Sequence, residues 1–207
     1  MPKKVILSDI GNVVVGFDNR RLSRLIAQRS EFDQAEIHRL VFSGPERLTR
    51  DYTRGRISTD DFRQLVLARF ACRDKITPTE FDTAFADVFS INCNVQQLWH
   101  RLRQRGATII AVSDLEELRH RQLEKIGVMA LFDEAVLSYH LQIAKPDRKM
   151  FTAALDLAGV PADQAVFVDD LPANIQAAQL VGLPTHQYGR FNELLYFLSQ
   201  HGFDVSS

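Results

Sequence analysis

The chain has 207 residues, of which 45% are hydrophobic, and a formal net charge of -1. It is long enough for one sizeable core, or for a core with a smaller inserted unit. The balanced charge gives no reason to expect a nucleic-acid partner or an anionic membrane surface, and the basic stretch 99–105 is spaced like the solvated face of a helix. No leader pattern and no apolar run of membrane-spanning length is found, and the two cysteines have no metal-site spacing. We therefore expect a soluble, cytoplasmic protein that is a monomer or a homodimer.

The first predicted element is a buried strand at residues 5–9. Its Val, Ile and Leu run is broken by Gly11-Asn12, which is typical of a parallel strand covered on both faces. The strand ends in Asp9, and the site of an open α/β sheet lies outside the carboxyl ends of its strands. On this stretch alone, a turn-capping role for Asp9 is the commoner interpretation.

Residues 17–94 are predicted to form a small all-helical cap inserted after the first strand. An apolar stripe begins at Leu22, and no convincing strand follows it in this part of the chain. Two helix starts have capping signals, one at Thr77-Pro78 and one at Ser58 or Thr59. The later cap helices are expected at 34–42, 45–54, 60–71 and 78–89.

Residues 1–16 and 95–207 are predicted to form the α/β core. Strands alternate with helices here, which implies a doubly wound parallel sheet of the Rossmann-like type. The expected strands are 108–112, 135–137, 165–168 and 185–188, and the expected helices are 95–105, 115–125, 148–158, 172–181 and 192–200.

Three predicted strands end in polar groups: Asp9, Ser113-Asp114 and Asp169-Asp170. If these strands are neighbours, their ends converge on one pocket. Its carboxylates would repel one another unless a cation lay among them, and hard oxygen ligands suit Mg²⁺. The Ser113 hydroxyl and the Lys145 ammonium add a hydrogen-bond donor and positive charge for an oxyanion, a combination that suits phosphoryl transfer.

Each of these residues also has an ordinary structural interpretation when it is taken alone. Ser113 could cap the helix that follows it, and Lys145 before a proline could be a solvated loop residue. Asp169-Asp170 could be a helix N-cap pair, and Asn174 could occupy a surface position on that helix.

Taken together, the motifs resemble those of the haloacid dehalogenase-like hydrolase superfamily. The resemblance rests on four ordered segments, which span nearly the whole chain: Asp9-Ile10-Gly11-Asn12-Val13, Val112-Ser113-Asp114, Lys145-Pro146-Asp147, and Val168-Asp169-Asp170 with Asn174. A helical insert after the first motif is where that family places its cap. The first motif looks most like that of phosphatases that read Asp-x-Gly-Asn-Val, such as the bacterial glucose-1-phosphatase-like enzymes.

The resemblance implies a Mg²⁺-dependent hydrolase of a small phosphorylated metabolite. Asp9 would be the nucleophile that forms an aspartyl-phosphate, and it would also bind Mg²⁺. The backbone carbonyl of Gly11 and the carboxylate of Asp170 would be further metal ligands. Asp169 would hold a metal-bound water.

The same resemblance assigns the residues around the phosphoryl group. Ser113 and the backbone N–H of Asp114 would hold its oxygens. Lys145 would neutralise those oxygens and orient the nucleophile. Asn174 would support the aspartates or Lys145 through a hydrogen bond.

Gly11 departs from the pattern of most phosphatases in the superfamily, which have an aspartate two residues after the nucleophile. That aspartate is a general acid and base, a role typically worth about 10² to 10⁴ in rate. Three interpretations follow. The protein could be an active phosphatase suited to good leaving groups, in which a metal-bound water or Asp18 replaces the general acid. It could instead be a regulator that holds a phospho-ligand, or a haloacid dehalogenase. The last is disfavoured by Asp169 and Asp170, which dehalogenases usually replace with neutral residues.

The cap is expected to select the substrate and to close by motion near residues 16–19 and 91–95. Four cap residues could reach the site, although a solvated basic face is the better interpretation. They are Arg47, Arg50, Tyr52 and Arg54.

Overall fold

A computed structural model describes residues 4–206 and contains a five-stranded parallel sheet in the order β5-β4-β1-β6-β7. Its strands are β1 (Val5–Ser8), β4 (Thr108–Ser113), β5 (Glu134–Leu137), β6 (Ala165–Asp169) and β7 (Thr185–Gln187). The predicted doubly wound core is confirmed. The strand order places β1 between β4 and β6, so the three strands that carry the expected site residues are neighbours.

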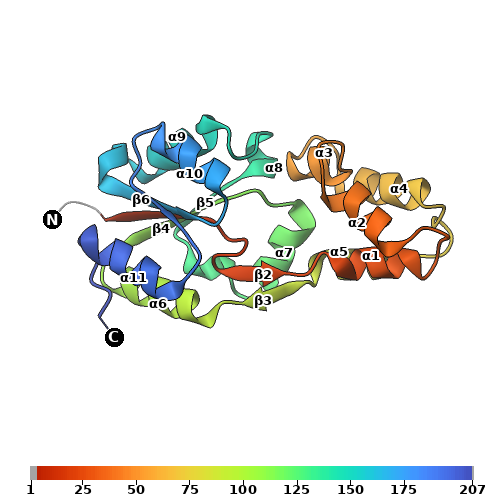
Figure 1. Ribbon diagram of the computed structural model, residues 1–207, viewed down its shortest axis with the longest axis horizontal. Helices are drawn as coiled ribbons and strands as arrows, with labels where there is room; N and C mark the ends of the chain where they lie inside the picture. The colour runs from red at the N-terminus through yellow and green to blue at the C-terminus, as the bar shows by residue number, and fades with distance from the viewer. Residues whose placement is uncertain (1–3, 207) are drawn as a thin grey trace.

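Helices cover both faces of this sheet (Figure 1). On one face lie α6 (Cys93–Gln104), α7 (Glu117–Lys125) and α11 (Phe191–Gln200), and on the other lie α9 (Arg148–Ala158) and α10 (Pro172–Gln179). Successive strand residues point to opposite faces, so Ile6 packs in the first layer while Val5 and Leu7 pack in the second. A short helix, α8 (Ser138–Leu141), follows β5, and 3₁₀ turns lie at Met129–Leu131 and Ala162–Gln164. Across residues 4–206, no helix is both long and apolar enough to cross a bilayer.

Five further helices lie together at the other end of the molecule (Figure 1). They are α1 (Arg20–Ala27), α2 (Gln34–Phe42), α3 (Thr49–Thr53), α4 (Thr59–Arg69) and α5 (Pro78–Ala86), and we call them the cap. They enclose their own buried cluster, which is built around Phe62, Phe81 and Phe85. Capping boxes start α4 at Ser58 and α5 at Thr77, so both predicted helix starts are confirmed.

A two-stranded antiparallel ribbon joins the cap to the core (Figure 1). It consists of β2 (Val15–Phe17) and β3 (Phe89–Ile91). The prediction that residues 17–94 contain no strand is wrong at β3, and the helix expected at 78–89 ends at Ala86. Three-residue strands are too short to show a period, and the two strands pair only in the folded chain. The helix expected at 45–54 forms only at α3, after a turn in which Gly44 has a φ of 80°.

Candidate active site

The carboxyl ends of β1, β4 and β6 bring most of the predicted site residues together. Asp9 follows β1, Ser113 ends β4 and Asp169 ends β6, and all three are buried. Parallel register produces this convergence, since Ser8 lies opposite Ala111 on one side and Val168 on the other.

The two oxygens of Asp9 have different surroundings. Oδ1 accepts hydrogen bonds from the Ile10 N–H at 2.7 Å and the Ser113 hydroxyl at 2.8 Å, and Lys145 Nζ lies 2.9 Å away. Oδ2 has no hydrogen-bond partner among residues 4–206. Burial raises the pKa of Asp9 to about 6, with Lys145 opposing that shift and Asp169 adding to it. One oxygen is therefore held in place, and the other is free to react or to bind a cation.

Lys145 links two of the carboxylates. Its Nζ donates to Asp169 Oδ2 at 2.7 Å as well as lying beside Asp9, and its side chain is 2% exposed. Burial alone would lower the pKa of Lys145, but the surrounding carboxylates raise it above its ordinary value. The lysine therefore stays charged, and it places a fixed positive group against the predicted nucleophile.

Asp114 anchors the loop that carries this lysine. Its Oδ1 accepts the backbone N–H of Lys145 at 2.8 Å, and burial raises the pKa of the Asp114 carboxyl. The sequence predicts a role only for the backbone N–H of Asp114. The carboxylate contact joins residues 31 apart in the chain, so no local pattern indicates it.

The carboxylates of Asp9, Asp169 and Asp170 fit a divalent cation. One oxygen from each lies within 4.8 Å of the others, and a set of hard oxygen donors suits Mg²⁺. The Gly11 carbonyl accepts no hydrogen bond within the described part of the chain, so this oxygen also remains available. The donor set is thus consistent with the predicted metal ligands.

Asp169 and Asp170 are held differently. Asp169 is fully buried and accepts the Leu171 N–H at 2.8 Å and the Asn174 amide at 2.9 and 3.0 Å. Asp170 is half-buried, and among the described residues its carboxylate accepts only the Asn12 amide, at 2.9 Å. The carboxylate oxygens of Asp169 are therefore used to hold Lys145 and Asn174, whereas Asp170 has more lone pairs available to bind a cation.

Asn12 is a site residue that we did not single out from the sequence. It adopts a left-handed backbone with a φ of 54°, a conformation that asparagine tolerates better than most residues. This turn brings its amide to Asp170 across 158 positions of sequence. The Gly-Asn pair indicated a turn, but the partner of the amide depends on the fold.

An aromatic ring borders the space beside Gly11. A Cβ atom added at Gly11 would lie 3.0 Å from Cε1 of Phe17 in β2. Asp18, the suggested substitute acid, is exposed and accepts the Arg20 N–H at 3.0 Å at the start of α1. Among residues 4–206, no contact joins the Asp18 carboxylate to the carboxylate cluster.

Of the four suggested cap contacts, Tyr52 is part of the cap interior. It is 2% exposed, stacks on Phe62 with 4.4 Å between ring centroids, and its hydroxyl accepts the Leu118 N–H at 3.2 Å. The other three, Arg47, Arg50 and Arg54, donate to backbone carbonyls of their own segment. Within residues 4–206 none of these three arginines forms an ion pair, as expected for a solvated basic face.

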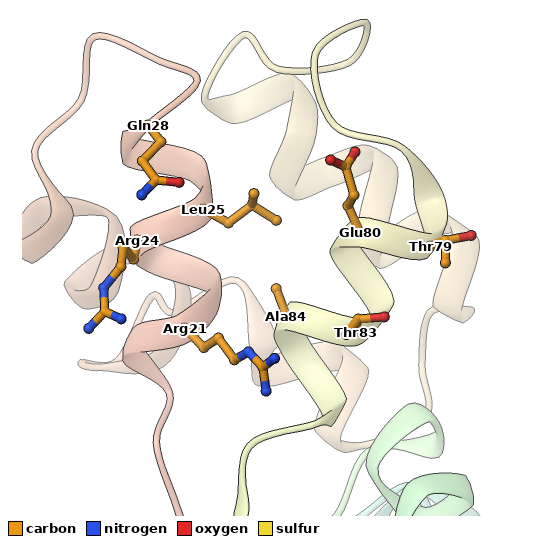
Figure 2. Close-up of a pocket in the computed structure, with 8 residues that line it drawn as sticks. All are labelled: Arg21, Arg24, Leu25, Gln28, Thr79, Glu80, Thr83 and Ala84. Carbon is orange, nitrogen blue, oxygen red and sulfur yellow. The ribbon is translucent and has the colours of Figure 1, made fainter.

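A groove of about 400 Å³ lies on the cap between α1 and α5 (Figure 2). These two helices lie at the end of the molecule away from the parallel sheet (Figure 1). Arg21 and Arg24 line it on the α1 side, and Glu80 and Thr83 line it on the α5 side. Arg21 is already paired with Asp87 at 3.1 Å. The groove brings together neither a carboxylate cluster nor a buried lysine, so we place the chemistry at the strand ends.

Solved structures share this fold. A HAD family enzyme from Bacteroides thetaiotaomicron, solved with magnesium and inorganic phosphate, superposes with a TM-score of 0.78 and is 21% identical. The superposition covers 90% of this chain and 94% of that one. At this level of identity, the likeness shows a common architecture.

Curated relatives include two phosphatases. The phosphoglycolate phosphatase of Rhodospirillum rubrum is 27% identical over 195 residues, which cover 89% of this chain and 78% of that protein. The pyrimidine 5'-nucleotidase YjjG of Escherichia coli is 26% identical over 141 residues, or 65% of this chain and 63% of the nucleotidase. Two other curated matches are covered over only 28% and 37% of their length. The chain therefore spans less than two-thirds of several relatives.

The profile of one protein family spans most of the chain. It is described as haloacid dehalogenase-like hydrolase and matches residues 3–182. This range includes all four motifs and every residue of the carboxylate cluster. The chain belongs to the haloacid dehalogenase-like hydrolase family.

Proposed function

We propose that the protein is a Mg²⁺-dependent phosphatase of a small phosphorylated metabolite and that it acts through an aspartyl-phosphate at Asp9. The observation that carries the proposal is the asymmetry of Asp9, with Oδ1 held by Ser113 and Lys145 and Oδ2 free beside two further carboxylates. The phosphatases among the relatives support it, as does the magnesium and phosphate complex of the Bacteroides enzyme.

The reaction has two displacements. In the first, the Asp9 carboxylate attacks the phosphorus atom, the bond from phosphorus to the leaving oxygen breaks, and that oxygen takes a proton from water. In the second, water attacks the same phosphorus, which releases inorganic phosphate and restores the Asp9 carboxylate. Forming the covalent intermediate divides one difficult step into two easier ones.

Protein donors surround the position that the phosphoryl group would occupy. Ser113 and Lys145 lie beside Asp9, and the N–H of Asp114 has no partner among the described residues. These groups stabilise the negative oxygens that develop in the transition state. Mg²⁺ bound by Asp9, Asp170 and the Gly11 carbonyl would neutralise further phosphoryl charge.

The leaving group is expected to depart without a protein acid, because Gly11 offers no side chain and Phe17 lies against it. This favours substrates with good leaving groups, such as a sugar 1-phosphate. This preference, together with the Asp-x-Gly-Asn-Val motif, also supports an assignment as a glucose-1-phosphatase-like enzyme. Residues 17–94 would act as a mobile cap over the core formed by 1–16 and 95–207, with motion at 16–19 and 91–95.

The test is hydrolysis of p-nitrophenyl phosphate and a panel of sugar phosphates, with Mg²⁺ or with chelator. We expect wild-type turnover to need the metal, and Asp9→Asn to reduce it to background. A folded protein that binds Mg²⁺ but shows no activity above the Asp9→Asn background would contradict the phosphatase proposal.

The same result would favour the second candidate, a protein that holds a phospho-ligand without fast turnover. The absence of an acid at Gly11 favours that candidate, because the site can bind a phosphoryl group yet lacks one catalytic group. A haloacid dehalogenase is disfavoured, since displacing halide from carbon needs no divalent cation and the chain keeps Asp169 and Asp170.

A further inference from the structure

Helix α7 belongs to both the core and the cap. It follows the Ser113-Asp114 turn closely and lies between the core and the cap in Figure 1. Leu123 of α7 packs in the core cluster, whereas Leu118, one and a half turns earlier, packs in the cap cluster. The N-terminal turn of α7 is therefore where the cap contacts the segment that carries the predicted phosphoryl-binding groups.

Cap side chains bind this first turn directly. The Tyr52 hydroxyl accepts the Leu118 N–H at 3.2 Å, and the Thr59 hydroxyl donates to Glu117 Oε2 at 2.8 Å. The Thr53 hydroxyl donates to Glu116 Oε1 at 2.8 Å, and Glu116 is 6% exposed. All three bonds are made by residues of α3 or α4.

Arg119 of α7 binds several segments where the cap meets the core. Its guanidinium donates to the Phe85 carbonyl of α5 at 3.3 Å, to Glu116 Oε2 at 3.4 Å and to Asn19 Oδ1 just before α1. The same group lies 4.3 Å from the Phe85 ring centroid, and the whole residue is 7% exposed. A buried arginine with partners on three sides fixes geometry that a flexible lysine cannot reproduce.

Arg119 also contacts the aromatic wall of the site. Its guanidinium carbon lies 5.6 Å from the ring centroid of Phe17, the ring that borders Gly11. Gly11 is two residues from Asp9. A continuous set of contacts thus runs from the cap, through Arg119 and Phe17, to the position from which a leaving group would depart.

We propose that Arg119, held by Glu116, is a positioning residue that seats the cap and the Phe17 ring over the phosphoryl site and thereby selects the leaving group. The inference rests on the proposed phosphatase function, because selection is read through turnover. Substrates whose leaving group extends between Phe17 and the cap depend on this pair. Substrates with a very small leaving group do not.

The experiment compares p-nitrophenyl phosphate, which has a large leaving group, with acetyl phosphate, which has a small one. Removing Arg119 alone leaves Glu116 buried without its partner, which often impairs folding. The main variant is therefore Glu116→Gln with Arg119→Met, two side chains of similar volume without charge. We expect its kcat/KM for p-nitrophenyl phosphate to fall roughly ten- to hundred-fold, the scale of small misplacements in an active site. The value for acetyl phosphate should change by less than about threefold, and Arg119→Lys should fall between this variant and wild type.

Lys125→Met is the control, because Lys125 is exposed at the end of the same helix and forms no ion pair among the described residues. It should leave both kcat/KM values unchanged. Amide hydrogen exchange gives a second measurement that needs no turnover: in the double variant, the amides of α3 and β2 should exchange faster while those of β1 should not.

Either of two results would overturn the proposal. One is a ratio of the two kcat/KM values that stays at the wild-type level in a folded double variant. The other is unchanged exchange at α3 and β2, which would show that the pair does not seat the cap. Failure of the proposed function would look different, with no Asp9-dependent turnover of either compound by wild type.

Discussion

Asp9 combines a buried position with negative neighbours, and both features make its ionised form unfavourable in the absence of a cation. The carboxylates of Asp9 and Asp169 share one ammonium group, from Lys145. Nucleophilic attack nevertheless needs an ionised carboxylate. In the proposed mechanism, the site therefore gives up some stability at neutral pH in order to hold a reactive carboxylate, an arrangement typical of functional sites.

A first prediction concerns how the free energy of unfolding depends on pH. The ordinary pKa of 3.8 for Asp9 in the unfolded chain rises to about 6 in the folded protein. Between these values the folded state binds more protons than the unfolded state, so the free energy of unfolding falls as pH rises. Asp9→Asn does not titrate, so its stability relative to wild type should increase by roughly 3 kcal/mol between about pH 4 and pH 6, and then stay level. Urea unfolding in chelator measures the difference, and a difference independent of pH would contradict the prediction.

A second prediction concerns Gly11 and Phe17. In Gly11→Asp alone, the new side chain meets the ring at 3.0 Å, so we expect little gain in activity. Gly11→Asp with Phe17→Ala makes room for an acid, and kcat/KM for a poor leaving group such as glycerol 3-phosphate should rise by about 10² to 10⁴ over Phe17→Ala.

The matched control for that variant is Gly11→Asn with Phe17→Ala, which has the same shape but cannot donate the proton. Asp18→Asn should leave turnover unchanged, since its carboxylate already accepts the Arg20 N–H. A large loss in Asp18→Asn would instead identify Asp18 as the missing acid.

At the level of elements, the sequence predicted the features that have local causes. Buried apolar runs marked β1, β4 and β6. Ser113 and Asp169 end their strands, and Asp9 directly follows β1. Helix starts at Ser58 and Thr77 followed from capping chemistry within four residues. The four family motifs then predicted that these strand ends form one site.

The features that escaped prediction depend on contacts between distant segments. Strands β2 and β3 have three residues each and pair across about 70 positions of sequence. The Arg119 contacts with Asn19 and Phe85, and the Asn12 contact with Asp170, are likewise long-range. Local sequence patterns do not describe such pairs, so the sequence predicts only a helix at 115–125 and none of its contacts with the cap.

A third prediction tests a capping box. The Ser58 hydroxyl accepts the Asp61 N–H at 3.1 Å, and its own backbone N–H donates to Asp61 Oδ2 at 3.3 Å. Ser58→Ala removes the first bond and also the 2.7 Å bond that the hydroxyl donates to Asp61 Oδ2, and it should lower the free energy of unfolding by about 1 kcal/mol. Ser58→Thr keeps the hydroxyl and should retain most of that free energy. Urea unfolding checks the order of the three proteins. Equal stability of all three would show that other contacts hold the start of α4.

At the level of the whole molecule, the carboxylate cluster and the cap depend on the same fold. Asp9, Asp169 and Asp170 come from the first and last thirds of the chain, so the cluster exists only in the folded protein. The cap contacts the core through the β2–β3 ribbon and through the first turn of α7. Under the proposed function, cation binding at the strand ends would therefore be coupled to global stability by mass action.

The last prediction measures that coupling. Added Mg²⁺ should raise the free energy of unfolding by about 3 kcal/mol at a hundred times its dissociation constant, because only the folded state presents the cluster. Asp170→Asn should remove most of this gain, since Asp170 keeps the most unused coordination capacity of the three carboxylates. Asp163→Asn is the matched control, because Asp163 lies in the 3₁₀ turn before β6 and outside the cluster. If Mg²⁺ stabilised Asp170→Asn as strongly as wild type, the cation would bind elsewhere and the proposed ligand set would be wrong. If Mg²⁺ stabilised neither wild type nor Asp170→Asn, the carboxylates would not bind the cation. The proposal of a metal-dependent reaction would then be wrong.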